Sequence, residues 1–261
     1  MPLTKTEVKD ILSLGTKKGR KQKKQFVAEG VRLLEEALRH RFLPQVLYLS
    51  EAMLSERGVT LARALGKAGV KIVVIASHQM ETIADTEAPQ GLLGLFAMPE
   101  SNPAKLSRGV PRNMLICDGI SDPGNLGTLI RSALAFDFAT VVMIGRSVDP
   151  YSPKVVRSSA GALFGVALIE CDLAELGRML RAQHAILIAA DVNGSASLRE
   201  MRENVRRRSI ALAVGSETDG LSRELMAQAE LRVKIAHRPL VESLNAAVAG
   251  SIAMKEIFDA G

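Results

Sequence analysis

The sequence predicts an α/β protein whose second half is built on a parallel sheet. Apolar runs of strand length recur through that half, and helical patterns separate most of them. Strands this apolar, alternating with helices, are typical of a parallel sheet that is covered on both faces. We expect these strands at Met114–Cys117, Thr140–Ile144, Val166–Glu170, Ala185–Ala190 and Ile210–Val214, with a weaker one at Leu231–Ile235.

The first 97 residues predict a second, smaller α/β unit. Their apolar residues recur alternately at helical and at strand spacing. We expect helices over 4–14, 29–41, 55–68 and 77–84, and strands over 46–49, 71–76 and 91–97. Residues 98–112 hold three prolines and show no periodicity, which is typical of a linker. The predicted domains are therefore 1–97 and 113–261.

Composition excludes several classes of protein. The chain is 47% hydrophobic and 24% charged, which indicates a globular protein rather than a disordered one. No apolar stretch approaches the roughly 18 residues of a membrane span, and the first residues lack the apolar segment of a signal peptide. Cys117 and Cys171 each end an apolar run and are expected to be thiols rather than a disulfide. We therefore expect a cytoplasmic protein that does not contact a membrane.

Positive charge is concentrated in the first part of the chain. Residues 1–112 carry 18 Lys and Arg against 11 Asp and Glu, whereas the remainder carries 16 against 17. Six of these cations fall within a predicted loop of eight residues: Lys17, Lys18, Arg20, Lys21, Lys23 and Lys24. Such a run is either a plain solvated segment or a phosphate-binding surface, since clustered cations release counterions from a nucleic acid.

Three clusters of polar residues and glycine follow predicted strands. They are 118–131 (DGISDPGNLGTLIR), 215–222 (GSETDGLS) and 242–245 (ESLN). The carboxyl ends of parallel strands meet at one edge of the sheet, so the loops that follow them can build a single ligand site. The sequence therefore predicts a site at this edge.

The first cluster combines turn residues with a helix start. Pro123, Gly124 and Asn125 favour a turn that begins a helix at Leu126. Arg131 lies far enough along that helix to point back toward the loop. A capped turn with a surface arginine and an anion site at a helix N-terminus both fit this pattern.

The other two clusters allow a structural as well as a functional interpretation. Gly215 permits the close approach of a ligand or of another backbone, but Ser216 and Glu217 also fit a capped helix start. Ser243 can cap the last helix, whereas Asn245 requires hydrogen-bond partners if it is buried. The small residues that follow, AAVAGSIA, predict close packing against the same domain or a second subunit.

Standard cofactor and metal signatures are absent from the sequence. No GxGxxG follows a strand, and no GxxxxGK[ST] occurs. The four histidines and two cysteines show no metal-ligand spacing, so no metal is expected. His237 lies near the third cluster, where a surface position is favoured over a catalytic one.

Taken together, the three clusters resemble the signature motifs of the TrmH/SpoU branch of the SPOUT RNA methyltransferases. DPGNLGTLIRSALAF resembles the first motif, VGSETDGLS the second and VKIAHRPLVESLNAAVAGSIA the third. Their order and spacing match, and the similarity covers about residues 113–258. The stretch KKQFVAEGVRLLEEAL resembles the substrate-binding domain that is common in the ribosomal-RNA members.

The resemblance implies a deep trefoil knot in the second domain, a homodimer, and S-adenosyl-L-methionine as the cofactor. The implied reaction is methyl transfer to a ribose 2′-hydroxyl of RNA, with ribosomal RNA as the expected substrate. Matching positions imply that Gly215, Ile235 and Leu244 bind the cofactor. They also imply a polar catalytic set: Asn125, Arg131, Glu217, Ser243 and Asn245.

Within that set, Arg131 is expected to clamp the substrate phosphate, because a guanidinium is always protonated and is a poor base. Glu217 is expected to orient Arg131, directly or across other loop residues. One stretch, 235–240, departs from the family because its proline is displaced and its glycine is missing. This departure leaves open the alternative that the chain is a non-catalytic RNA-binding or ribosome-assembly protein of the same fold. A second alternative is a methyltransferase that acts on tRNA.

Overall fold

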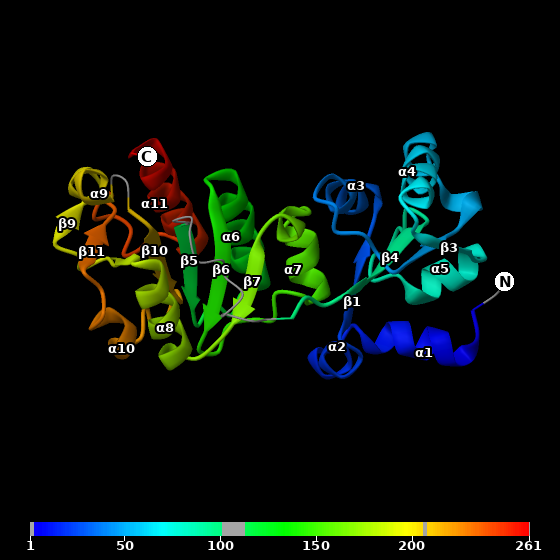
Figure 1. The fold of residues 1–261 in the computed structure, drawn as a ribbon, viewed down its shortest axis with the longest axis horizontal. Helices are drawn as coiled ribbons and strands as arrows, with labels where there is room; N and C mark the ends of the chain where they lie inside the picture. Colours follow the sequence, from blue (N-terminus) through cyan, green and yellow to red (C-terminus); the bar gives the residue numbers. More distant parts are fainter. Residues whose placement is uncertain (1–2, 101–112, 206–207, 261) are drawn as a thin grey trace. The chain divides into compact units, whose positions relative to one another are not determined.

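The computed structural model describes residues 3–100, 113–205 and 208–260, which divide into two compact units (Figure 1). The first unit contains the residues up to 100 together with 151–164, and the second contains the other described residues. The predicted linker, 98–112, lies outside the described residues from 101 onward.

A four-stranded mixed sheet forms the centre of the first unit. Its order is β1-β4-β2-β3, with β4 antiparallel to β1 and β2, and β2 parallel to β3. The strands are β1 (Gln25–Glu29), β2 (Val46–Leu49), β3 (Lys71–Val74) and β4 (Leu92–Ala97). The sequence analysis missed β1, because five residues directly before a helix are too few to show a period of their own.

Helices cover this sheet and agree broadly with the predicted ones. They are α1 (Lys5–Ser13), α2 (Lys17–Lys23), α3 (Val31–Arg39), η1 (Glu51–Met53), α4 (Glu56–Lys67), α5 (Ser77–Ile83), α7 (Pro153–Ser158) and η3 (Ala162–Phe164). The buried residues of α3, including Leu33, Leu34 and Ala37, recur at helical spacing. This amphipathic pattern explains why α3 was predictable.

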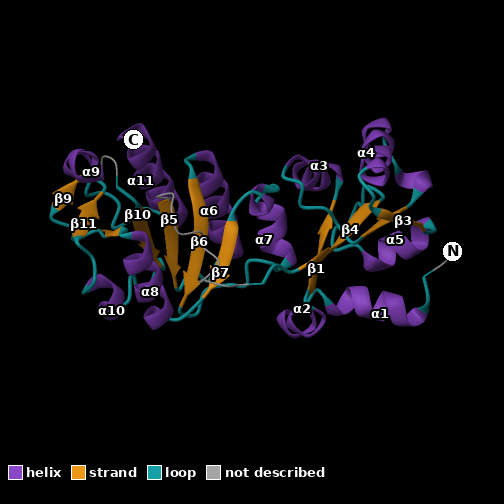
Figure 2. Ribbon diagram, in the orientation of Figure 1, coloured by secondary structure: helices purple, strands orange, loops and turns teal. Residues whose placement is uncertain are grey.

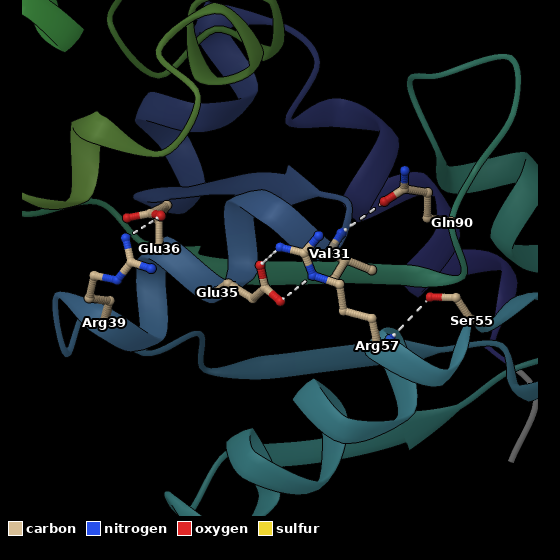
Figure 3. Close-up of polar contacts among 8 residues, drawn as sticks. Val31, Glu35, Glu36, Arg39, Ser55, Arg57 and Gln90 are labelled. Atoms are coloured by element: carbon tan, nitrogen blue, oxygen red, sulfur yellow. Dashed lines mark hydrogen bonds and ion pairs between the residues drawn. The ribbon is translucent and has the colours of Figure 1, made fainter.

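The start of α3 depends on a distant side chain (Figure 3). Its N-cap is Gly30, which has no side chain, so Gln90 Oε1 accepts the hydrogen bond from Val31 N at 3.0 Å. Farther along, Glu35 accepts bonds from Nε and Nη2 of Arg57 on α4 at 2.6 and 2.5 Å. This hydrogen bonding holds the pKa of Glu35 below its usual value. Because Arg57 is largely exposed, the pair orients the two helices more than it stabilises them.

An aromatic cluster fills part of the core of the first unit. The ring of Phe26 lies 5.3 Å from that of Phe96 and 4.8 Å from that of Tyr151, between ring centres. Phe164 packs on Phe96 at 5.1 Å and on Phe42 at 5.4 Å. The segment 151–164 therefore completes this core, although it follows β6 (Phe138–Ile144) in the chain and was predicted to lie in the second domain.

The basic segment is a helix and not the predicted loop. Thr16 caps α2 by accepting a hydrogen bond from Gly19 N at 3.1 Å, and Lys24 ends it in the left-handed conformation. A side chain on Gly19 would overlap the backbone of α1, which shows how closely α1 and α2 pack. Arg20 is 2% exposed and donates to Leu14 O at 2.7 Å, so it supports this packing. The lysines at 17, 18, 21, 23 and 24 are exposed.

Seven parallel strands form the sheet of the second unit, in the order β7-β6-β5-β10-β8-β11-β9. They are β5 (Asn113–Asp118), β6 (Phe138–Ile144), β7 (Ala167–Glu170), β8 (Ile186–Ala190), β9 (Ala196–Ser197), β10 (Ile210–Gly215) and β11 (Leu231–Lys234). The predicted parallel sheet is confirmed. Only β9 was not predicted, because two residues are too few to form a recognisable apolar run.

Helices lie on both faces of this sheet (Figure 2). They are α6 (Pro123–Ala135), α8 (Leu173–Gln183), α9 (Leu198–Val205), α10 (Arg223–Met226) and α11 (Ala246–Ala260). Helix α8 packs on the face that carries Ala211 and Ala213. Helices α6 and α11 pack together on the opposite face, where a Cβ on Gly250 would lie 2.6 Å from Leu129 and 3.0 Å from Val214. The small residues of α11 thus serve packing within the same unit.

Both cysteines are free thiols. Burial raises the pKa of Cys117 to about 12 and that of Cys171 to about 11, so the reactive thiolate form is scarce at neutral pH. Among the described helices, none combines the length and the apolar character that crossing a membrane requires.

Candidate functional site

The three sequence clusters lie at one edge of the parallel sheet. They follow β5, β10 and β11, whose carboxyl ends point the same way because all these strands are parallel. Strands β5 and β10 are neighbours, and the chain continues from β5 to β6 on one side before it returns to β8 on the other. Such a reversal of strand order is where open α/β sheets place their ligands.

The loop after β5 ends in a well-capped helix. Asp122 Oδ1 accepts a hydrogen bond from Asn125 N at 2.8 Å, and Pro123 occupies the first helical turn. Helix α6 therefore begins three residues before the predicted start at Leu126, and Asn125 lies within its first turn rather than capping it. Arg131 is exposed, and its guanidinium has no hydrogen-bond or ion-pair partner among the residues that the structure describes.

The loop after β10 is a tight turn and not the alternative helix start. Ser216 and Gly220 exchange two backbone hydrogen bonds of 3.1 Å, and Ser216 Oγ accepts from Asp219 N at 3.0 Å. A Cβ on Gly215 would lie 2.1 Å from the backbone of Gly220, so this turn requires glycine at 215. The turn carries Glu217 at the carboxyl edge of the sheet.

Asp118 joins the first two loops, and the sequence analysis assigned it no role. Its side chain is 7% exposed at the end of β5, and Oδ2 accepts a hydrogen bond from Ser222 N at 2.7 Å. Breaking this hydrogen bond would leave a buried carboxylate oxygen without a partner, so the bond stabilises the position of Ser222. Asp118 thus fixes the far end of the loop that contains Glu217.

Asn245 is the N-cap of the last helix. Its Oδ1 accepts hydrogen bonds from Ala247 N at 3.0 Å and Val248 N at 3.2 Å. Helix α11 begins at Ala246, so the prediction that ESLN opens the helix was early by a few residues, and Ser243 does not cap it.

Asn125, Glu217 and Asn245 bring the three clusters together. Glu217 Oε1 accepts hydrogen bonds from Asn125 Nδ2 at 3.1 Å and from Asn245 Nδ2. Asn245 Nδ2 also lies 2.9 Å from Asn125 Oδ1. Neither Arg131 nor Ser243 belongs to this network. Among the described residues Glu217 makes no direct contact with Arg131, and it holds two asparagines instead.

A cavity of about 450 Å³ opens beside this network. Gly215, Ile235 and Leu244, the three positions implied to bind the cofactor, all line it, as do Glu217 and Ser243. Asn125, Arg131 and Asn245 do not line it. The remaining lining residues are Ala190, Asp191, Val192, Asn193, Val214, Ser216, Thr218, Asp219, Gly220, Leu221, Met226, Val233, His237, Glu242, Ala246 and Ala249.

The loop after β8 is a part of the cavity that the sequence analysis missed. Asp191 Oδ2 accepts hydrogen bonds from Nε and Nη2 of Arg232 at 3.0 and 2.6 Å, and its Oδ1 accepts from Asn193 N at 3.1 Å. The sequence offered only one signal for Asp191, which is its position directly after the apolar run of β8. That position brings it to the same edge of the sheet. In the part of the chain that the structure describes, no group of three or more His, Cys, Asp or Glu side chains is placed to hold a metal ion.

Two family descriptions match the chain at the two units. The SpoU rRNA Methylase family matches residues 112–255, and the MRM3-like substrate binding domain matches residues 5–94. The first match contains all three clusters and every residue of the hydrogen-bond network.

Individual proteins are similar over nearly the whole chain. A 23S rRNA guanosine 2′-O-methyltransferase of Bacillus subtilis is 29% identical over 94% of this chain and 93% of its own. An uncharacterised tRNA/rRNA methyltransferase of Synechocystis is 32% identical over 95% of this chain and 89% of its own. The crystal structure of an AdoMet-bound rRNA methyltransferase from Sinorhizobium meliloti has a TM-score of 0.85 at 27% identity, covering 98% of this chain and 95% of that one. The resemblance of the three motifs is thereby confirmed, and the chain belongs to the SpoU rRNA methylase family.

Proposed function

We propose that this protein transfers the methyl group of S-adenosyl-L-methionine to a ribose 2′-hydroxyl of ribosomal RNA. The observation that carries the proposal is the convergence of the three motifs on the Asn125–Glu217–Asn245 network beside the cavity. The Bacillus relative is named as a 23S rRNA 2′-O-methyltransferase, and the Sinorhizobium structure is of an AdoMet-bound rRNA methyltransferase.

The cavity fits this cofactor in size and chemistry. Its volume of about 450 Å³ is in the range of small-molecule sites. Val192, Leu221, Met226 and Val233 provide apolar surface for an adenine ring, and carboxylates in the lining suit a positively charged sulfonium. Gly215, Ile235 and Leu244 are the residues that we assign to hold the cofactor.

The cofactor supplies a methyl group that is already activated by its sulfonium charge. The protein therefore has to align the attacking ribose oxygen and assist the loss of its proton. We assign to Arg131 the clamping of a substrate phosphate and the stabilisation of negative charge that develops on that oxygen. The proton passes to a substrate phosphate oxygen or to water, since a guanidinium does not accept it.

The other polar residues position the substrate. Glu217 accepts from both asparagine amides, which holds Asn125 and Asn245 in one orientation. Ser243 lines the cavity, and we assign its hydroxyl to bonding the ribose. In this mechanism Glu217 acts on the asparagines and not directly on Arg131.

The first unit supplies RNA affinity. Five exposed lysines on and next to α2 form the proposed phosphate-binding surface: Lys17, Lys18, Lys21, Lys23 and Lys24. Arg20 is not part of this surface, because its guanidinium is buried against Leu14. The match of this region to a substrate-binding domain family supports the assignment of residues 1–97 to RNA binding, and the SpoU match supports that of 113–261 to methyl transfer, with 98–112 as the linker. Within the second range, 151–164 belongs to the first unit and is not assigned to methyl transfer.

We further propose that the second unit contains the trefoil knot of the resembled family, that the protein is a homodimer, and that it acts in the cytoplasm. Val248 and Phe258 support the dimer, because these apolar residues of α11 are 47% and 50% exposed. The free thiols and the RNA substrate agree with a cytoplasmic site of action.

Methyl transfer to isolated RNA tests the function directly. Labelled S-adenosylmethionine is incubated with total RNA from a strain that lacks the gene, and the products are digested to nucleosides. We expect one 2′-O-methylnucleoside in the large-RNA fraction, and none with Arg131→Ala. Label in the tRNA fraction would redirect the substrate assignment. RNA binding with no label on RNA or on ribosomal particles would support the non-catalytic alternative.

A further inference from the structure

The cavity of the second unit has an uneven distribution of charge. Four of its lining residues carry carboxylates: Asp191, Glu217, Asp219 and Glu242. None of the lining residues is Lys or Arg, so among them His237 is the single basic side chain. A ligand with separate positive and negative groups therefore meets four carboxylates and a single basic side chain in this lining.

The hydrogen bonding of His237 leaves one ring nitrogen for a ligand. Nδ1 lies 2.9 Å from the carbonyl oxygen of Ile235, two residues earlier in the loop after β11. A carbonyl only accepts hydrogen bonds, so Nδ1 carries the proton in this contact. Nε2 has no hydrogen-bond partner among the described residues. The backbone contact thus anchors the half-buried ring and makes Nε2 the atom that a ligand can meet.

The cofactor of the proposed function has the complementary distribution of charge. Its sulfonium and its α-ammonium are positive, and its methionyl carboxylate is its only negative group. The first two suit the carboxylates of the lining, whereas the third suits a donor that carries positive charge. Resting on the proposed function, we propose that His237 Nε2 binds the methionyl carboxylate of S-adenosylmethionine and so selects the intact cofactor.

The contact depends on which ring nitrogens carry protons. When both are protonated, Nε2–H donates a charge-assisted hydrogen bond to the carboxylate. When only Nδ1 carries a proton, the lone pair of Nε2 repels a carboxylate.

The other charged groups of the cavity do not provide this donor. Asp191 is paired with Arg232, and Glu217 accepts from two asparagines. Asp219 accepts from Thr218 Oγ1, and Glu242 is exposed. All four carboxylates disfavour a bare ligand carboxylate in the cavity. Without His237, the methionyl carboxylate would enter a cavity lined by like charge.

Calorimetric titration with two ligands tests the assignment. Decarboxylated S-adenosylmethionine keeps the sulfonium and the ammonium and lacks only the carboxylate. For the wild type at pH 6 we expect the intact cofactor to bind about tenfold more tightly, which corresponds to about 1.4 kcal/mol.

Two variants make the test specific. His237→Asn retains an amide near the position of Nδ1, so the contact to Ile235 O is preserved while Nε2 is removed. We expect it to bind both ligands equally. His78→Asn, an exposed histidine of the first unit, is the matched control and should behave as the wild type.

The inference would be overturned if His237→Asn kept the wild-type preference for the intact cofactor. It would mean that the carboxylate points to solvent or meets another donor. Failure of the proposed function would give a different result from failure of this inference. In that case S-adenosylmethionine, its decarboxylated form and 5′-methylthioadenosine would all fail to bind the wild type and the variants. That outcome removes the cofactor assignment and this inference together.

Discussion

The two units place their functional groups in different ways, and strand direction explains the difference. In the second unit all strands are parallel, so the loops after β5, β8, β10 and β11 gather at one edge and enclose a cavity. In the first unit β4 is antiparallel to β1 and β2, so loops leave the sheet at both ends. Its functional candidates are instead the exposed lysines of a surface helix.

The two units are therefore suited to different kinds of ligand. A cavity with a hydrogen-bonded network can discriminate a small molecule atom by atom, because each displaced group leaves another unsatisfied. A row of exposed lysines attracts any phosphate backbone and responds to salt. We therefore expect changes in the second unit to affect catalysis and changes on α2 to affect affinity.

Truncation of the aromatic core tests whether the units are independent. Phe26 is fully buried in the first unit, and Phe26→Ala should lower the free energy of unfolding of that unit by about 3–5 kcal/mol. Hydrogen exchange in the first unit measures this loss, and Leu12→Ala, at a half-exposed position, is the control.

The same variant should leave the second unit closed. Cys117 is buried on β5 with its pKa raised to about 12, so a thiol reagent modifies it only when this sheet opens. We expect unchanged modification kinetics in Phe26→Ala. If modification of Cys117 became faster to the same extent as hydrogen exchange in the first unit, the two units would unfold together and would not be independent.

Removal of the Arg131 guanidinium should abolish catalysis without affecting the cofactor. Arg131→Ala is expected to lower kcat by about a hundredfold or more, the usual effect of losing a group that stabilises developing charge. Because Arg131 does not line the cavity, the Kd for S-adenosylmethionine should not change. Arg131→Lys should recover little, since a lysine cannot make a bidentate contact. Arg199→Ala on the exposed side of α9 is the control, and wild-type rates in Arg131→Lys would refute the clamp.

Loss of the Glu217 carboxylate should have an intermediate effect. Glu217→Ala leaves two asparagine amides without their acceptor, and hydrogen bonds to a charged group contribute about 1.5–3 kcal/mol. We expect kcat/KM to fall about tenfold to a hundredfold, and less in Glu217→Gln, which keeps an acceptor oxygen. Glu203→Ala on α9 is the control. If the effects of Glu217→Ala and Asn245→Ala simply added, the two residues would not act as one network.

Neutralising the basic helix should have the smallest effect on catalysis and a clear effect on binding. Changing Lys17, Lys18, Lys21 and Lys24 to Gln should weaken RNA binding about tenfold near physiological salt. The slope of log affinity against log salt should fall by up to about four, roughly one for each lysine that binds a phosphate in the wild type. A matched variant that neutralises Lys5, Lys9, Lys67 and Lys71 removes the same charge elsewhere. Equal effects of the two sets would show that only net charge matters.

Local patterns determined much of this protein in advance. The apolar runs predicted all but one short strand of the parallel sheet, because a strand buried on both faces is apolar at every position. The three clusters could be located because they follow those strands. The resemblance they carry predicted the family, and Gly215, Ile235 and Leu244 indeed line one cavity.

Elements without an apolar pattern could not be predicted in this way. Helix α2 was taken for a loop because it is almost entirely polar, and its helical start depends on Thr16 and on Gly19 packing against α1. The start of α11 was misplaced because Ser243 fits an N-cap by residue type as well as Asn245 does. Only the structure shows that Asn245 Oδ1 accepts the backbone hydrogen bonds of the first turn.

The tertiary structure alone decided which distant residues act together. Glu217 and Asn125 are 92 positions apart in the sequence, and Asp118 and Ser222 are 104 apart. Phe26 packs against Tyr151, although the first strands of the second unit lie between them in the sequence. Periodicity reports how a segment buries one of its faces, and this is a local property. A hydrogen bond between two loops depends on strand order and direction, which are set only when the whole sheet assembles.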